Sequence, residues 1–207
     1  ASSEAGGLVT FRLPIHYQMA LEQPETYGYL LDSAGTEAPL TRVDCLDDDL
    51  NPVPQGEIGE LAISGPSVFR GYWERPEETV KVLRNGWLLT GDLAYKDKDG
   101  VIFIKGRKRE MIKTGGVNVY PAEIEPVLEL HDAVVEAAVV GIPDKEWGEK
   151  VVAFVVAKSK ISETELIDFC RDKLAAYKRQ KQIVFVDEFP MKAGKVLKRA
   201  LIERLTG

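Results

Sequence analysis

Two short segments of this chain place a charged side chain directly after glycine, where the backbone can turn tightly and approach a ligand. One is Thr90-Gly91-Asp92, whose carboxylate can accept hydrogen bonds from two hydroxyl groups and therefore suits a ribose. The other is Gly194-Lys195, whose compact ammonium lies in a basic segment that could meet phosphates. Taken alone, each segment is more typical of an ordinary surface turn.

A third stretch, from Gly106 to Glu125, combines a basic segment, a pair of glycines and the start of a helix. Gly115 and Gly116 permit positive φ angles and close backbone approach, although a plain hairpin turn would use them in the same way. Pro121 then opens a helix that carries acidic residues near its positive end. This combination is typical of a joint between two domains that move.

The elements that position these segments form a β-rich first half. Residues 1–40 lack a clean hydrophobic period and are interrupted by prolines, so we expect loops with one helix at most. Alternating patterns predict a hairpin from 42–46 and 59–63, with a polar tip between them. The further predictions are a helix over 77–83, a strand over 87–90 ending in a turn at 91–92, and a second hairpin that turns at 97–100 into a strand over 101–104.

After Arg109, short strands alternate with helices. β-Branched runs predict strands, and Ser162-Glu163-Thr164-Glu165 is a capping box ahead of helical spacing that continues to Leu174. The predicted elements are helices over 121–130, 162–174 and 196–205, and strands over 134–140, 151–156 and 182–186. A compact α+β domain of about a hundred residues follows from this order.

Bulk properties narrow the class of protein. The 207 residues are 44% apolar, which is ample for a buried core, and no apolar run reaches the length of about 18 residues that a membrane-spanning helix needs. The first residues lack the order of a secretory signal, so we expect a cytoplasmic protein. Cys45 and Cys170 lie far apart, as do His16 and His131, which argues against a disulfide or a metal–thiolate site.

Charge is unevenly divided along the chain. Residues 1–106 hold nine basic and seventeen acidic side chains, whereas 107–207 hold eighteen basic and sixteen acidic ones. The acidic first half should repel nucleic acid, which we do not expect as a partner. The second half has a local basic cluster that is either a solvated face or a surface that meets phosphates; it consists of Lys178, Arg179, Lys181, Lys192, Lys195, Lys198 and Arg199.

Together these segments resemble the adenylate-forming enzymes, the superfamily of acyl-CoA synthetases, luciferases and peptide-synthetase adenylation domains. Residues 1–6 resemble the tail of an aromatic-Gly-x-Thr-Glu motif, 106–125 the hinge and its following loop, and 190–199 the closing segment with its catalytic lysine. The resemblance implies an α+β fold class. Residues 1–108 would be the last, distorted barrel-like part of the large AMP-binding domain, and 109–207 the mobile C-terminal lid domain.

The same resemblance implies roles for particular residues. Asp92 and Arg107 would bind the ATP ribose from two sides, and Lys195 would be the catalytic lysine that neutralises charge at the α-phosphate. Arg109 stands where the family has its Asp or Lys hinge, and Glu110 replaces the usual Asp. Neither change should remove function, because a hinge needs backbone freedom more than a specific group.

Two further pairs complete the predicted site. Ser3 would replace the motif's Thr, and Glu4 would be the Glu associated with Mg²⁺. Gly115 and Gly116 would line the tunnel for the pantetheine thiol of CoA, where a side chain would block passage.

The function implied is that of an AMP-forming acyl-CoA synthetase acting on a carboxylic acid with ATP, Mg²⁺ and CoA. The loop at 111–121 is closer to the acyl-CoA ligase branch than to peptide-synthetase domains. Nothing resembles the upstream phosphate loop, so the chain would need the N-terminal portion of its enzyme as a partner and should be inactive alone. The alternatives are an adenylation domain that loads a carrier protein, and a non-catalytic interaction module.

Overall fold

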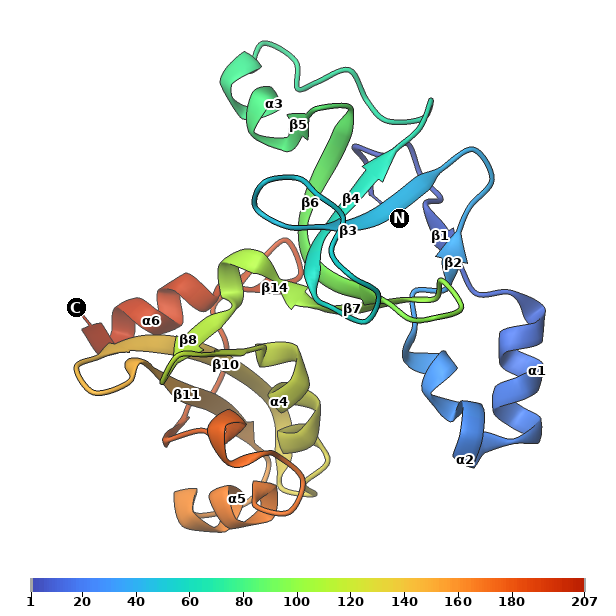
Figure 1. Cartoon of the computed structure of the whole chain (residues 1–207). Coiled ribbons are helices and arrows are strands. Elements are labelled where there is room, and N and C mark those ends of the chain that lie inside the picture. The colour runs from blue at the N-terminus through green and yellow to red at the C-terminus, as the bar shows by residue number, and fades with distance from the viewer. Residues whose placement is uncertain (1, 207) are drawn as a thin grey trace. The chain divides into compact units, whose positions relative to one another are not determined.

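The computed structural model describes residues 2–206 and contains two compact units, which divide between Lys108 and Arg109 (Figure 1). Each unit has its own antiparallel or mixed sheet and its own hydrophobic core. Over the described residues, no helix has the length and apolar character needed to cross a bilayer. The predicted cytoplasmic location stays a prediction.

The first unit is built on a curled antiparallel sheet in the order β3-β4-β6-β5, with β7 beside β6. Its inward side chains alternate along each strand, as in Val43 and Cys45, and they meet Leu61, Ile63 and Ile102 in one core. The strands are β3 (Arg42–Leu46), β4 (Gly59–Ser64), β5 (Leu83–Arg84), β6 (Trp87–Lys96) and β7 (Ile102–Arg107), and α3 (Pro76–Val82) precedes β5. The predicted β-rich, barrel-like subdomain is confirmed.

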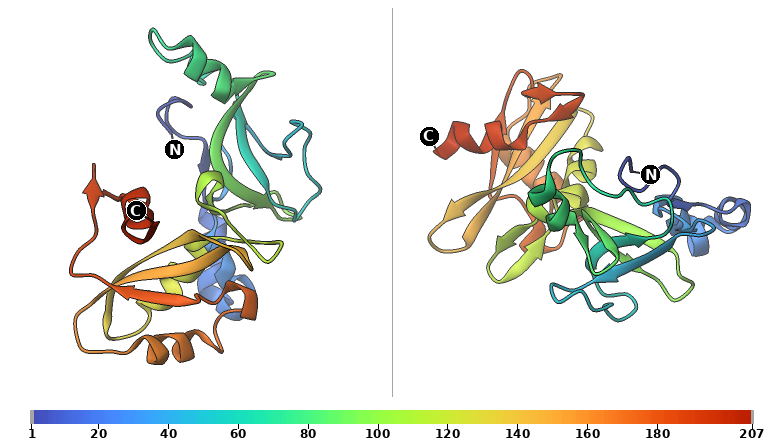
Figure 2. Two further views of the ribbon diagram at one scale, coloured as in Figure 1. Left: turned by 90° about the vertical axis from the view of Figure 1, so that its left-hand side faces the viewer. Right: turned by 90° about the horizontal axis from the view of Figure 1, so that it is seen from above.

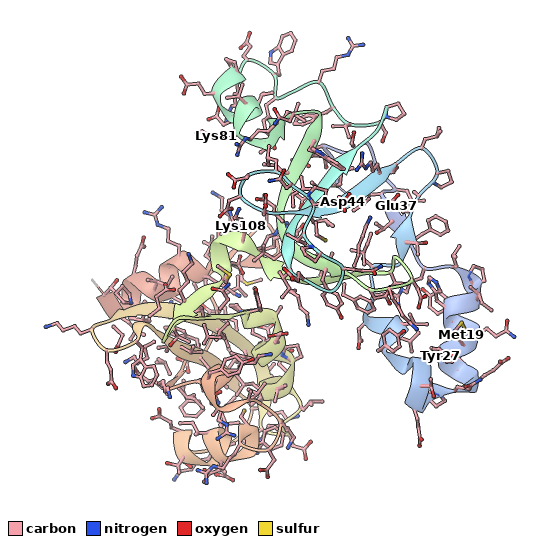
Figure 3. The ribbon with its side chains drawn as sticks, viewed as in Figure 1. Met19, Tyr27, Glu37, Asp44, Lys81 and Lys108 are labelled. Carbon is pink, nitrogen blue, oxygen red and sulfur yellow. The ribbon has the colours of Figure 1, made fainter. Side chains whose placement is uncertain are left out.

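The prediction for residues 1–40 was wrong, because two α-helices lie there. They are α1 (Pro14–Glu22) and α2 (Pro24–Tyr27), followed by the 3₁₀ helix η1 (Gly28–Asp32), and the short strands β1 (Thr10–Phe11) and β2 (Thr36–Glu37) flank them. Pro14 and Pro24 stand at the first turns of the helices, where a missing N–H costs nothing, so they start helices instead of breaking them. Met19 and Tyr27, labelled in Figure 3, pack against buried Phe103 and its neighbours.

The expected strand end at Gly91 and Asp92 was also wrong. β6 continues through both residues, and Gly91 has a φ angle of 73° at a point where the register with β4 shifts. Glycine adopts this angle without strain, so the strand bulges and bends where a turn was expected. The bulge re-aims the residues beside it, which are Thr90 and Asp92.

The second unit has a sheet in the order β10-β11-β8-β9, with β12 parallel to β11. The strands are β8 (Ile112–Thr114), β9 (Val117–Val119), β10 (Val134–Asp144), β11 (Gly148–Ala157) and β12 (Gln182–Phe185). Because β11 is apolar on both faces, it is covered on both sides. Val151, Ala153 and Val155 face α4 (Pro121–Glu129) and α5 (Glu163–Cys170), whereas Val152 and Phe154 face α6 (Lys198–Thr206). The ribbons in Figure 2 show these helices on the two faces of the sheet.

Two helix boundaries in this unit differ from the prediction. α5 is capped by Ser162, whose side chain accepts a hydrogen bond from Glu165 N at 3.2 Å, but it ends at Cys170 instead of Leu174. The terminal helix begins at Lys198 because residues 191–196 form a hairpin of β13 (Met191–Lys192) and β14 (Lys195–Val196). Ala193 and Gly194 turn this hairpin with φ angles of 50° and 75°. A two-residue turn of this kind suits the twist of paired strands.

Candidate active site

Asp92 and Arg107 lie directly opposite each other on β6 and β7, and Arg107 Nε is 3.0 Å from Asp92 Oδ1. Arg107 Nη1 also donates to the carbonyl of Thr90 at 3.1 Å, so one guanidinium spans the bulge. The two side chains predicted to bind one ribose are therefore neighbours in the first unit. The ribose role itself stays a prediction.

The bulge that carries Asp92 is fixed by hydrogen bonds to β4. Thr90 Oγ1 donates to the carbonyl of Leu61 at 2.8 Å and accepts from Asp92 N at 3.1 Å. The amide of Gly91 donates to Glu60 Oε1 at 3.1 Å. Partial burial raises the pKa of Asp92, and the positive charge of Arg107 opposes this rise. The carboxylate is thus held in place but partly withdrawn from water, which strengthens its interaction with a hydroxyl donor.

Glu4 lies in the same unit with two partners that the sequence did not reveal. The Tyr72 hydroxyl donates to Glu4 Oε1 at 3.1 Å, and the Ser2 hydroxyl donates to Oε2 at 3.3 Å. Hydrogen bonding, first from the backbone and then from these hydroxyls, lowers the pKa of Glu4. The side chain of Ser3 is exposed, and its carbonyl accepts a hydrogen bond from Gly6 N at 3.2 Å, so its nucleotide-binding role stays a prediction.

The predicted metal role of Glu4 requires ligands from elsewhere. Among residues 2–206, no three His, Cys, Asp or Glu side chains gather in a group that could hold a metal ion. Mg²⁺ often binds through only one or two carboxylates together with substrate phosphates. A single ionised Glu4 fits that pattern, and the metal would then arrive with a nucleotide.

Gly115 and Gly116 form the two-residue turn between β8 and β9, with φ angles of 56° and 81°. The two positions differ in their surroundings. A Cβ at Gly115 would lie 3.1 Å from a ring carbon of Trp147, whereas a Cβ at Gly116 would meet nothing within 4 Å. Trp147 therefore backs the turn on one side, and its carbonyl accepts from Gly115 N at 2.8 Å. Gly116 faces open space, where a passing chain would not clash.

Lys195 lies on the exposed hairpin that precedes α6, opposite Lys192. Within the described part of the chain, no carboxylate or hydrogen-bond acceptor pairs with its ammonium. An unpaired ammonium on a short hairpin is available to an anionic ligand. Lys195 belongs to the second unit and Asp92 to the first.

Arg109 begins the second unit, and its side chain is 84% exposed. It lines a cavity of about 360 Å³ together with Glu110, Lys198 and apolar residues of β10 and α6. The turn η2 (Lys108–Glu110) carries the chain from one unit to the next. The role of Arg109 as a hinge stays a prediction.

Comparison with known proteins gives matches along most of the chain. The family described as AMP-binding enzyme matches residues 2–73, and the AMP-binding enzyme C-terminal domain matches residues 123–195. A long-chain-fatty-acid–CoA ligase of Escherichia coli O6:H1 is 44% identical over 186 residues, which are 89% of this chain and 33% of that protein. A 2-succinylbenzoate–CoA ligase of Bacillus mycoides is 42% identical over 182 residues, or 87% of this chain and 38% of that protein.

A solved structure has the same fold at similar coverage. The o-succinylbenzoate CoA synthetase MenE from Bacillus subtilis, in complex with the acyl-adenylate intermediate OSB-AMP, has a TM-score of 0.87 at 33% identity, over 97% of this chain and 40% of that chain. The same enzyme was also solved with ATP and a magnesium ion, with a TM-score of 0.86 at 32% identity and the same coverage. This chain spans about a third to two-fifths of the length of these relatives. Both family matches, these relatives and the α+β fold agree. The chain therefore belongs to the adenylate-forming, AMP-binding enzymes.

Proposed function

We propose that this chain is the C-terminal part of an AMP-forming acyl-CoA synthetase. The observation that carries the proposal is the Asp92–Arg107 pair, which lies on adjacent strands just before the division between the two units. It combines a carboxylate that suits ribose hydroxyls with a guanidinium beside a hinge. The relatives support it, because the proteins matched above are named as CoA ligases and one is described with an acyl-adenylate.

In the first half-reaction, an oxygen of the substrate carboxylate attacks the α-phosphorus of ATP, and the bond to pyrophosphate breaks. Two anions approach each other in this step, so charge builds on the phosphoryl oxygens. Lys195 would neutralise that charge, while Asp92 and Arg107 hold the ribose. Mg²⁺ would enter with the ATP phosphates and take Glu4 as one ligand.

In the second half-reaction, the thiol sulfur of CoA attacks the acyl carbonyl, and AMP leaves with the former carboxylate oxygen. The sulfur must pass the turn at Gly115 and Gly116 to reach the adenylate. The open space beside Gly116 supports this route, because a side chain there would stand in the path. We expect the enzyme in the cytoplasm, where both ATP and CoA are supplied.

The substrate that we propose is a carboxylic acid, without a further choice among acids. Relatives of nearly equal identity, 44% and 42%, are named for a long-chain fatty acid and for 2-succinylbenzoate. Those acids differ in length and in aromatic character. Similarity over this part of the chain therefore does not distinguish between acids.

The test is a pair of assays on the complete enzyme that contains this sequence. Exchange of labelled pyrophosphate into ATP, dependent on an added carboxylic acid, should report the adenylate. Thioester formation should then require free CoA. Acid-dependent exchange with no CoA thioester, but with acyl transfer to a phosphopantetheinyl carrier protein, would replace the proposal with the carrier-loading alternative.

A further inference from the structure

Three consecutive charged residues cross from the first unit to the second, and their surroundings differ sharply. Lys108, Arg109 and Glu110 form the turn η2, and the units divide after the first of them. Arg109 is 84% exposed, and its nearest carboxylate oxygen is 3.9 Å away on Glu110. Such an exposed and distant pair contributes little to stability. The residues on either side of Arg109 are held far more firmly.

Lys108 is fixed to the first unit. Its Nζ lies 2.7 Å from Oδ1 of Asp48, which is 90% exposed, and 3.0 Å from Oε2 of Glu60. Glu60 is only 14% exposed, and its other oxygen accepts the Gly91 amide, so the anchor rests on a fixed group. Hydrogen bonding, first to Asp48, raises the pKa of Lys108, which keeps the ammonium charged at neutral pH.

Glu110 is fixed to the second unit by Lys198. Lys198 Nζ lies 3.1 Å from Glu110 Oε2 and 2.7 Å from Glu125 Oε1, and its side chain is 19% exposed. Lys198 is the first residue of α6, which is seated in the core by fully buried Leu201. Glu125 also accepts a hydrogen bond from Val139 N at 2.8 Å. One ammonium thereby joins the turn η2 to α4, α6 and β10.

The two anchors restrict where the chain can pivot. Each anchor lies wholly within its own unit, so a rotation of one unit against the other need not break either. A largely covered ammonium shared by two carboxylates costs more to remove than an exposed pair, because it leaves two like charges together. A hinge needs only a few backbone angles that can change, and Arg109 is the one residue of η2 that neither anchor holds.

We propose that Lys108 and the Glu110–Lys198 pair confine the pivot to Arg109, with Lys198 acting as a positioning residue for domain rotation. This inference rests on the proposed function, in which the second unit takes two orientations. A short pivot would bring Lys195 to the adenylate site in one orientation and Gly116 to it in the other. A longer and looser pivot would lower the populations of both orientations.

Limited trypsin cleavage of the complete enzyme after Arg109, with mass spectrometry of the fragments, tests the anchors without an activity assay. Cleavage needs several residues around Arg109 to open, so releasing an anchor should speed it. We expect Lys198→Met to raise the cleavage rate at least about fivefold. Glu110 directly follows the cleaved bond, so its substitution is tested through the half-reactions and not by cleavage. Lys198→Arg should restore the wild-type rate. Arg199→Met, on the same helix, is the matched control and should change nothing.

The half-reactions provide a second measurement. Lys198→Met and Glu110→Gln should lower pyrophosphate exchange and thioester formation by similar factors. Lys198→Met should also lower the stability to urea, because two carboxylates lose their shared cation, so both half-reactions are measured where each variant is fully folded. Glu125→Gln removes the other carboxylate partner of Lys198 but leaves the Glu110–Lys198 pair in place, so it should affect the half-reactions less than Glu110→Gln. Equal cleavage in wild type and Lys198→Met would overturn the inference. Altered cleavage in an enzyme that forms no CoA thioester would instead overturn the proposed function and leave the anchors in place.

Discussion

Asp92 and Arg107 form an ion pair of 3.0 Å between register partners on β6 and β7, yet the burial of Asp92 raises its pKa despite that pair. The folded state therefore binds the Asp92 proton more tightly than the unfolded state does. As pH rises from the unfolded pKa of Asp92 to its higher folded pKa, ionisation of this residue progressively lowers the free energy of unfolding. Above both pKa values, the loss of stability stays constant. A carboxylate kept at such a cost is typical of a binding site.

Asp92→Asn should accordingly be no less stable than wild type at neutral pH, while nucleotide binding weakens about tenfold or more through the loss of a charged hydrogen-bond acceptor. Urea unfolding at pH 7 and at pH 4, together with calorimetric titration of ATP, measures both effects in the complete enzyme. The stability difference between variant and wild type should shrink at the lower pH, where wild-type Asp92 takes up its proton. A marked loss of stability at pH 7 with normal ATP binding would assign Asp92 a purely structural role.

Lys195→Met should lower pyrophosphate exchange about 100-fold, the scale for removing one electrostatic stabiliser of the transition state. Thioester formation from a preformed adenylate should stay nearly unchanged, because that step builds no new charge on the α-phosphate. Lys192→Met is the matched control, since Lys192 pairs with Lys195 across the same hairpin and is also exposed. Equal losses in the two variants would mean that the hairpin contributes only general positive charge.

Gly116→Leu should leave pyrophosphate exchange within about twofold of wild type and suppress thioester formation at least about tenfold, by blocking the thiol path. Strain at positive φ is the confounding effect, and Gly86 isolates it. Gly86 has the same φ of 81°, and a Cβ there would also meet nothing within 4 Å. Gly86→Leu should show the same loss of stability without a change in the ratio of the half-reactions. A parallel fall of both half-reactions in Gly116→Leu alone would show that the turn only supports folding.

Tyr72→Phe should raise the pKa of Glu4, because it removes the hydroxyl that donates to Glu4 Oε1 at 3.1 Å. A depressed carboxylate pKa contributes stability above its unfolded value, and that contribution is lost as pH falls through the folded value. As the pH falls below 4.5, the Tyr72→Phe variant should therefore lose less free energy of unfolding through Glu4 than wild type does. Carbon-detected NMR titration of the Glu4 carboxyl measures the shift directly. Ser2→Ala should move the same signal in the same direction but by less, because Ser2 is the smaller contributor.

Local patterns predicted much of the fold. Strand alternation, the capping box at Ser162 and proline at the first turn of α4 depend on residues a few positions apart, so the sequence alone was enough to place them. The same local rules failed at Pro14 and Pro24, since a proline that starts a helix looks like one that prevents it. They failed again at Gly91, where pairing with β4 on one side and β7 on the other keeps the strand continuous.

The candidate site depended on both levels. The roles of Asp92, Arg107, Gly115, Gly116 and Lys195 were predicted from residue type, from neighbouring glycines and from family resemblance. Only the tertiary structure joined Glu4 to Tyr72, which is 68 positions away, and placed Trp147 behind Gly115. It alone showed the ion pairs of Lys108 and Lys198 on either side of Arg109. Strand register and helix packing bring such residues together, and neither leaves a periodic signal in the sequence.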